Sequence, residues 1–126
     1  TKYINGLCKY YYKNGKIERE GLFKNGLEEG LWKHYYKNGK LEAEVNFIDG
    51  LEQGKYKGFF KNGQLGSEGK YIDGFEQGLW KYYFSDGTLE RKGNYKDGLS
   101  HGKWTLYKGN GKLKTVLRYK NGNILK

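Results

Sequence analysis

The sequence has little of what most catalytic or metal-binding centres are made from. Its 126 residues include one cysteine, two histidines, no proline and no methionine. A single cysteine excludes an internal disulfide framework and a metal site built on paired cysteines. No apolar run approaches the roughly 18 residues that a membrane-spanning helix needs. Because only 36% of the residues are hydrophobic, we also expect no thick aliphatic core.

Glycine, aromatic residues and lysine are what the chain has in abundance. It contains 21 glycines, 13 tyrosines, 6 phenylalanines and 3 tryptophans, and flat rings can cover a thin sheet with little aliphatic help. The formal net charge is +10 at pH 7. Such a charge favours anionic partners: an acidic protein, nucleic acid, a teichoic-type polymer or anionic lipid. A solvated lysine coat that protects strand edges from aggregation explains the same charge.

Eleven Asn-Gly or Asp-Gly pairs divide the chain at regular intervals. From Gly15 onward, their glycines are spaced alternately 11 and 13 residues apart. These pairs favour two-residue β-hairpin turns, and a 24-residue period indicates a repeat array. We therefore predict an all-β fold, an elongated single-layer antiparallel sheet of consecutive β-hairpins, in a single repeat domain over residues 1–126. The expected units are 6–29, 30–53, 54–77, 78–101 and 102–125.

A two-residue turn at each pair would also determine which residues face each other across the hairpin. Around Asn38-Gly39 the predicted pairs are Lys37–Lys40, Tyr36–Leu41, His34–Ala43, Trp32–Val45 and Gly30–Phe47. In the fourth unit they are Phe84–Leu89, Trp80–Gly93 and Gly78–Tyr95. One face is therefore apolar, and its large rings lie across from glycines that leave room for them.

The opposite face is predicted to be charged, with one aromatic ring in every unit. Its expected cross-strand ion pairs are Lys9–Glu20, Lys33–Glu44 and Lys57–Glu68, and its rings are Tyr11, Tyr35, Phe59, Tyr83 and Tyr107. The longer connections, such as residues 72–78, leave open whether they form a tight hairpin or a looser loop. The same holds for the face taken by Leu27, Leu51, Phe75 and Leu99.

The recurring pattern G-x-W-x-x-Y-Y-x-N/D-G-x-L-x-x-x-G-x-Y-x-D/N-G, seen at residues 30–50 and 78–98, resembles the MORN repeat. It is most similar to the variant with a doubled aromatic and a K-N-G-K-L turn, here residues 37–41, found in proteins grouped as YwqK-type antitoxins. The resemblance covers residues 6–125. It implies a twisted sheet of hairpins without enzymatic activity that binds proteins or, in some members, phospholipid head groups. The antitoxin grouping implies direct neutralisation of a toxin.

A second resemblance concerns residues 80–87, W-K-Y-Y-F-S-D-G, which are similar to choline-binding and related cell-wall-binding repeats. Those repeats are shorter, build ligand cages from tryptophans and end in T-G-W. Here the period is 24 and no Gly-Trp pair occurs, which disfavours a choline cage.

No group of residues in the sequence predicts catalysis, a metal or a cofactor. The two histidines, His34 and His101, occupy different places in their units, so they share no geometry as ligands or bases. Cys8 has no convincing catalytic partner. Turn aspartates are already explained by hairpin chemistry. We therefore expect a protein that is not an enzyme and has no cofactor.

Nucleic acid is a disfavoured partner. Aromatic residues alternate with lysine in residues 9–13 and 81–84, a pattern in which rings stack on bases and lysines meet phosphates. The two-residue alternation of a strand, however, places half of these rings on the packing face of the sheet.

Our first hypothesis is a non-enzymatic scaffold that binds another protein with an acidic surface, as an antitoxin or immunity partner would. A one-layer sheet leaves much of its aromatic face to be covered. Aromatic residues near the middle of such a patch carry binding energy, so the expected contact residues are Trp32, Tyr36, Tyr56, Phe60, Trp80, Phe84 and Trp104. Simple packing of these rings within a curled sheet is the alternative.

Two further hypotheses stay open. One is binding of a cell-envelope ligand, either anionic phospholipid head groups or wall glycan, and the other is self-association through the unpaired first and last strands. The chain begins at Thr1 rather than methionine, from which we expect upstream trimming. Both a secreted or envelope location and a cytoplasmic one therefore remain.

Overall fold

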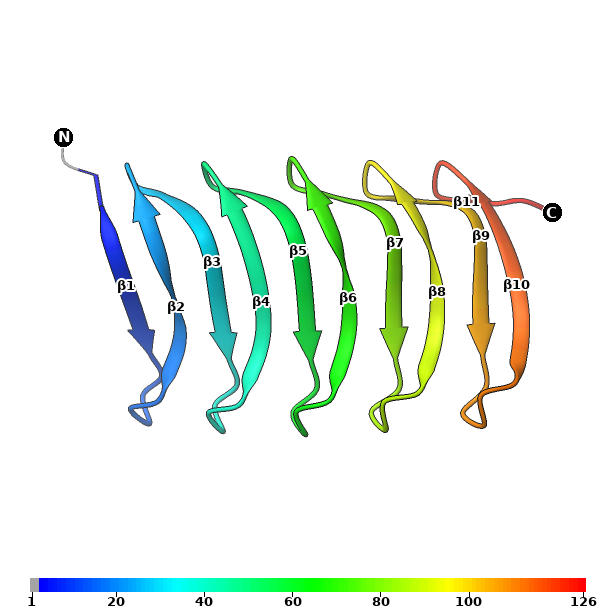
Figure 1. Ribbon diagram of the computed structural model, residues 1–126, viewed down its shortest axis with the longest axis horizontal. Coiled ribbons are helices and arrows are strands. Elements are labelled where there is room, and N and C mark those ends of the chain that lie inside the picture. Colours follow the sequence, from blue (N-terminus) through cyan, green and yellow to red (C-terminus); the bar gives the residue numbers. More distant parts are fainter. Residues whose placement is uncertain (1–2) are drawn as a thin grey trace.

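The chain forms one open antiparallel sheet, described over residues 3–126 by a computed structural model. Its 11 strands lie side by side in the order in which they occur in the chain (Figure 1). The predicted all-β, single-layer array of consecutive hairpins is confirmed. The strands are β1 (Gly6–Tyr11), β2 (Ile17–Lys24), β3 (Leu27–Tyr35), β4 (Leu41–Ile48), β5 (Leu51–Phe59), β6 (Leu65–Ile72), β7 (Phe75–Tyr83), β8 (Leu89–Lys96), β9 (Leu99–Tyr107), β10 (Leu113–Lys120) and β11 (Asn123–Ile124). Across residues 3–126, no helix has the length and apolar character to span a membrane.

Tight two-residue turns join the strands along the upper edge of the sheet in Figure 1. Between β6 and β7, Ile72 pairs with Phe75, and the two residues between them, Asp73 and Gly74, have φ values of 51° and 86°. Positive φ at both central residues is characteristic of a type I′ turn, whose twist matches that of the strands. The connection that the sequence left open is therefore a tight hairpin.

The loops along the opposite edge are longer, so the predicted two-residue turn at Asn38-Gly39 is wrong. The Gly39 N–H donates to the Tyr36 carbonyl (2.9 Å), and the Tyr36 N–H donates to the Lys40 carbonyl (2.8 Å). The loop therefore contains three residues, 37–39. The Asn38 side-chain oxygen accepts a hydrogen bond from the Lys40 N–H (2.8 Å), and only Gly39 is left-handed, with φ of 89°. This is a type I turn followed by a left-handed glycine.

The extra loop residue changes the pairs nearest each loop and leaves the others as predicted. Tyr35 rather than Tyr36 pairs with Leu41, and Tyr83 rather than Phe84 pairs with Leu89. An irregularity one residue further on returns the strands to the predicted register. The confirmed pairs are His34–Ala43, Trp32–Val45, Gly30–Phe47, Trp80–Gly93 and Gly78–Tyr95.

The core of this single layer consists of rings on one face, here called the indole face after Trp32, Trp80 and Trp104. These three side chains are only 1%, 3% and 5% exposed, although no second layer covers them. A Cβ atom added to Gly69 would lie 2.1 Å from the ring of Trp80, so the indole rests directly on the backbone. The Trp80 Nε1–H donates to the carbonyl of Lys70 (3.1 Å).

The glycine that makes room for each indole is not the one predicted. Trp80 pairs with Gly93, but its ring lies over Gly69 of the preceding strand, and Gly93 lies under Trp104. The register between β6 and β7 shifts at Gly69, which leaves this glycine without a partner in β7, although it pairs with Tyr56 of β5, and opens the space for the ring. Where Val45 takes the glycine position, the ring that follows is the smaller Tyr56.

The opposite face, here called the lysine face, carries the predicted lysine and glutamate neighbours without the predicted ion pairs. Lys57 pairs with Glu68, yet the Glu68 carboxylate accepts a hydrogen bond from the Tyr83 hydroxyl instead. Within residues 3–126 the one ion pair joins Arg91 and Glu90, at 3.8 Å. Exposed lysines gain little from such pairs, because water solvates the ammonium group well.

Adjacent hairpins are bonded to each other at both edges of the sheet. At the tight-turn edge the Gly50 N–H donates to the Glu28 carbonyl (2.9 Å), and at the loop edge the Tyr12 hydroxyl donates to the Tyr35 carbonyl (2.6 Å). The four residues whose face was left open lie at the tight-turn edge, each about half exposed and close to the glycine of the next turn. They are Leu27, Leu51, Phe75 and Leu99.

We predict that Gly69→Ala lowers the free energy of unfolding by about 3 kcal/mol, because the new methyl group displaces the Trp80 indole from the backbone. Urea unfolding followed by tryptophan fluorescence measures this change.

The matched control is Gly109→Ala. Gly109 has open space where a Cβ atom would lie and no left-handed φ, so its replacement is expected to change stability by no more than about 0.5 kcal/mol. Equal stability of the two variants would contradict the role assigned to the Trp–Gly contact.

Candidate functional site

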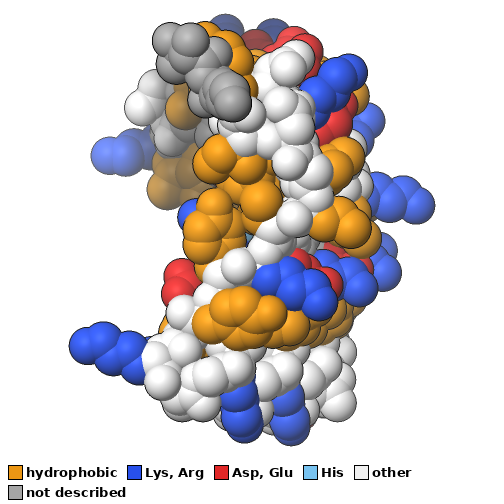
Figure 2. Space-filling view, turned by 90° about the vertical axis from the view of Figure 1, so that its left-hand side faces the viewer, with side chains coloured by type: hydrophobic (Ala, Val, Ile, Leu, Met, Phe, Trp, Pro, Cys, Tyr) orange, Lys and Arg blue, Asp and Glu red, His pale blue; other side chains and the backbone are white. Residues whose placement is uncertain are grey.

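The seven expected contact residues divide into buried and partly exposed rings. Trp32, Trp80 and Trp104 are buried, so they present almost no surface to a partner. The other four, Tyr36, Tyr56, Phe60 and Phe84, are intermediate in exposure. Figure 2, which looks along the sheet from the end with the N-terminus, shows hydrophobic side chains on both sides of the layer and basic side chains that reach outward.

A hollow of about 400 Å³ lies on the indole face at the third repeat. Three of the expected residues, Tyr36, Tyr56 and Phe60, line it, whereas Phe84 does not. Sequence reasoning missed other lining residues, among them Tyr82, Glu42 and Glu90, and it placed two further lining residues, Phe59 and Tyr83, in the row of rings on the lysine face. The structure therefore combines aromatic rings from three neighbouring repeats with two carboxylates.

The hollow exists because the third repeat has small residues where other repeats have large ones. Gly58 stands where the first and fourth repeats have Tyr10 and Tyr82, and its pairing partner is Ser67. Gly66, at the same edge, replaces a glutamate that the first, second and fourth repeats have. All three small residues line the hollow. Their shared departure from the repeat was the signal in the sequence that could have located the site.

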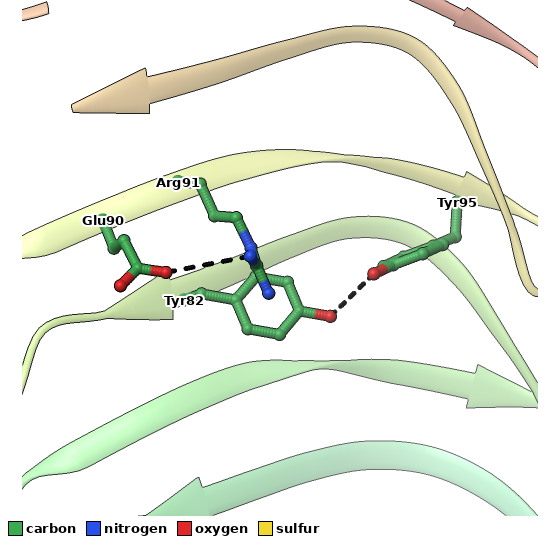
Figure 3. A network of polar contacts seen from close by, with 4 residues as sticks. All are labelled: Tyr82, Glu90, Arg91 and Tyr95. Atoms are coloured by element: carbon green, nitrogen blue, oxygen red, sulfur yellow. Dashed lines mark hydrogen bonds and ion pairs between the residues drawn. The ribbon is translucent and has the colours of Figure 1, made fainter. Parts of the chain in front are cut away.

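The fourth repeat shows the pair of side chains that fills this place in two of the repeats (Figure 3). The guanidinium of Arg91 stacks on the ring of Tyr82, with Cζ 4.2 Å from the ring centroid. The Tyr82 hydroxyl is 2.8 Å from that of Tyr95, and Arg91 Nη1 is 3.8 Å from Glu90 Oε1. In the first repeat Arg19 stacks on its paired tyrosine in the same way, at 4.3 Å.

Burial raises the pKa of three tyrosines of the indole face, Tyr56, Tyr71 and Tyr82. It raises the pKa of Tyr56, and it raises that of Tyr82 further, with a contribution from the hydrogen bond to Tyr95. Burial raises the pKa of Tyr71 to about 12, helped by the charge of Glu76. These hydroxyls are neutral at pH 7 and act as hydrogen-bonding groups.

His34, the one histidine of this face, is favoured in its neutral form. Burial is the main cause of its lowered pKa, and the charge of Arg19 adds to it. Over residues 3–126, no three histidine, cysteine, aspartate or glutamate side chains form a group that could hold a metal ion.

A second hollow, of about 560 Å³, lies on the lysine face near the centre of the sheet. It is lined by four lysines and one acidic residue, Glu68, beside Leu79, whose side chain is 50% exposed. The lysines are Lys55, Lys57, Lys70 and Lys81. The two faces of the same repeats thus differ in chemistry, one aromatic and acidic at its rim and the other strongly basic.

Comparison with known families identifies the repeat. The MORN repeat variant matches residues 4–25, 28–49, 52–73, 76–97 and 100–124. The chain belongs to this family. Each MORN repeat after the first begins in the strand that follows a tight turn and ends in or just after the next tight turn. Comparison with curated proteins finds no match. The MORN array and the single-layer sheet are consistent with a non-enzymatic repeat scaffold.

We predict that Tyr71→Phe reduces the loss of stability at alkaline pH. Tyr71 contacts Trp80 edge-on, with ring centroids 5.2 Å apart. Its pKa is about 12 when folded against 10.0 in the unfolded reference, so its contribution is complete below pH 10 and is lost as pH rises from 10 through 12. Urea midpoints at several pH values across this range measure the effect.

Wild type and Tyr71→Phe share all their other ionisable groups, so the difference in stability between the two proteins is the quantity compared. The two stability curves should run parallel below pH 10 and converge or cross above it. Parallel curves over the whole range would contradict the assigned role of Tyr71.

Proposed function

We propose that this MORN protein is a non-enzymatic scaffold of the antitoxin or immunity type that binds another protein on its indole face. The observation that supports this proposal is the hollow at the third repeat, which the partly exposed rings of Tyr36, Tyr56 and Phe60 line. An aromatic depression near the centre of an uncovered sheet is the kind of surface on which binding energy concentrates.

The buried tryptophans have a supporting role in this proposal. Trp80 stacks on Tyr56 with ring centroids 5.5 Å apart and meets Tyr82 at 6.3 Å. Trp32 and Trp104 occupy the corresponding places in their own repeats, where they pack against neighbouring rings. Rings held in this way lose little conformational entropy when a partner binds. The contact surface is thus assigned to Tyr36, Tyr56, Phe60 and Phe84.

The charge of the protein supports a partner with an acidic surface. The net charge is +10, and exposed lysines stand at the loop edge beside the rings, among them Lys37 and Lys61. Charges around the rim of an interface accelerate association and set its orientation more than they add affinity. Lys37 and Lys61 therefore attract an acidic partner to the loop edge, next to the aromatic hollow.

We predict that the purified product of a neighbouring toxin gene binds this protein, and that Phe60→Ala weakens the affinity about tenfold or more, since truncating a central aromatic anchor costs about 2 kcal/mol. Isothermal titration calorimetry measures the affinity, and co-expression tests whether the protein restores growth in the presence of the toxin.

Phe75→Ala is the matched control, because Phe75 is an exposed phenylalanine at the tight-turn edge that does not line the hollow. Its replacement is expected to leave the affinity unchanged. A neighbouring gene product that neither binds nor is neutralised would reject the antitoxin proposal.

The lysine-face hollow supports a second candidate function, the binding of anionic phospholipid head groups. Lys55 and Lys70 are exposed and pair directly across the hollow, and the exposed Leu79 beside them offers an apolar contact. Lysines near a membrane surface each contribute about 1 kcal/mol of attraction to anionic lipid.

For this second candidate we expect sedimentation with vesicles that contain phosphatidylglycerol and none with pure phosphatidylcholine. Binding should weaken as salt rises and fall in the double variant Lys55→Glu/Lys70→Glu. The exposed lysines Lys114 and Lys120 lie outside the hollow, so replacing both by glutamate makes the same charge change as a control. Equal losses in the two double variants would show that only net charge matters and would reject a defined site.

A further inference from the structure

The third repeat lacks a pair of side chains that the chain itself uses elsewhere. In the first and fourth repeats a paired tyrosine and arginine form a cation–π stack, Arg19 on Tyr10 and Arg91 on Tyr82. The equivalent pair in the third repeat is Gly58 and Ser67. The hollow therefore occupies the place where a guanidinium group lies in two other repeats.

The groups around the hollow are suited to a cation. Glu42 and Glu90 stand at the rim. Glu90 already has Arg91 nearby, whereas Glu42 has no cation at ion-pairing distance within residues 3–126. The rings of Tyr36, Tyr56 and Tyr82 line the interior, and Arg91 already stacks on Tyr82. Carboxylates and the faces of aromatic rings attract a guanidinium group through hydrogen bonds and cation–π contact.

The loop edge of the hollow adds one more acceptor. In the second repeat the Tyr36 hydroxyl donates to the carbonyl of Phe59, as Tyr12 does to Tyr35. The corresponding residue of the third repeat is Phe60, which has no hydroxyl, so the Tyr83 carbonyl receives no such bond. The Tyr82 hydroxyl, by contrast, already has Tyr95 as its partner. The hollow thus offers acceptors and ring faces.

We propose that this hollow binds the guanidinium group of an arginine side chain presented by the protein partner. Arginine fits better than lysine, because its planar guanidinium group stacks on aromatic rings and forms bidentate hydrogen bonds with carboxylates. The hollow opens on the face of a sheet, so a free small molecule would be covered on one side only. A side chain carried by a partner is covered on the other side by the partner itself. This inference rests on the proposed protein-binding function.

The test uses the isolated protein and a defined probe. N-acetylarginine methylamide is titrated into ¹⁵N-labelled protein, with the citrulline analogue as an uncharged probe of the same shape. We expect saturable shifts of the Gly58, Gly66 and Ser67 amides with the arginine probe alone. In Glu42→Gln, which keeps the side-chain shape, the affinity should fall about tenfold through loss of a charge-assisted hydrogen bond.

A variant whose own side chain occupies the hollow tests where the probe binds. Ser67→Arg places an arginine where the first and fourth repeats have one, so it should abolish binding of the probe while the sheet stays folded. Thr115→Arg makes the same change at the equivalent position of the fifth repeat, away from the hollow, and should leave binding unchanged.

Equal binding of the arginine and citrulline probes, or an equal effect of Ser67→Arg and Thr115→Arg, would overturn the proposal. Failure of this titration rejects the arginine site and leaves protein binding to be judged from the toxin experiment. Failure of the toxin experiment alone rejects the antitoxin proposal and leaves the titration result standing.

Discussion

A sheet one layer thick has no opposing layer, so its large side chains must be buried against its own backbone. The contact between an indole ring and a bare glycine of the preceding strand meets this constraint, as Trp80 does on Gly69. The register shift at the glycine makes the space, and the indole N–H satisfies the carbonyl of the next residue. The rings then lie flat enough to pack on one another along the face. Both the low exposure of the tryptophans and the shape of the indole face follow from this contact.

The repeat period and most of the register could be predicted from the sequence, because a strand's two-residue alternation and the Asn/Asp-Gly spacing leave few alternatives. The Asn-Gly or Asp-Gly dipeptide alone does not distinguish the three-residue loops from the two-residue turns, because both contain it. Asp73-Gly74 and Asn38-Gly39 look alike, yet a side-chain hydrogen bond to Lys40 holds Asn38 in a right-handed turn. The signal was in the spacing: intervals of 11 and 13 residues accommodate different turns. The prediction of ion pairs was wrong for a different reason. Strand register places a lysine opposite a glutamate, but it does not decide whether the two side chains contact each other or stay solvated by water.

Only a minority of the residues in the candidate site could be predicted from the sequence. Tyr36, Tyr56 and Phe60 belong to the recurring aromatic pattern, and they do line the hollow. A search for shared large residues could not find the hollow itself, because it arises where the third repeat has lost them, at Gly58 and Ser67. The tryptophans were chosen as contacts on the same pattern, but residue type alone does not tell whether a ring supports a surface or forms it. In a single-layer sheet, whether a ring is buried or exposed depends on the residue that lies beneath it.

Because spatial order and chain order coincide in this sheet, every repeat interacts only with its two neighbours. The side-chain bonds between hairpins join residues no more than 23 positions apart. Loop-closure costs are therefore small, and folding can start in any hairpin and spread in both directions. Because of this locality, a change of two or three residues within one unit, as in the third unit, alters the surface there while the rest of the array keeps its geometry. Specificity in such a protein can evolve one hairpin at a time.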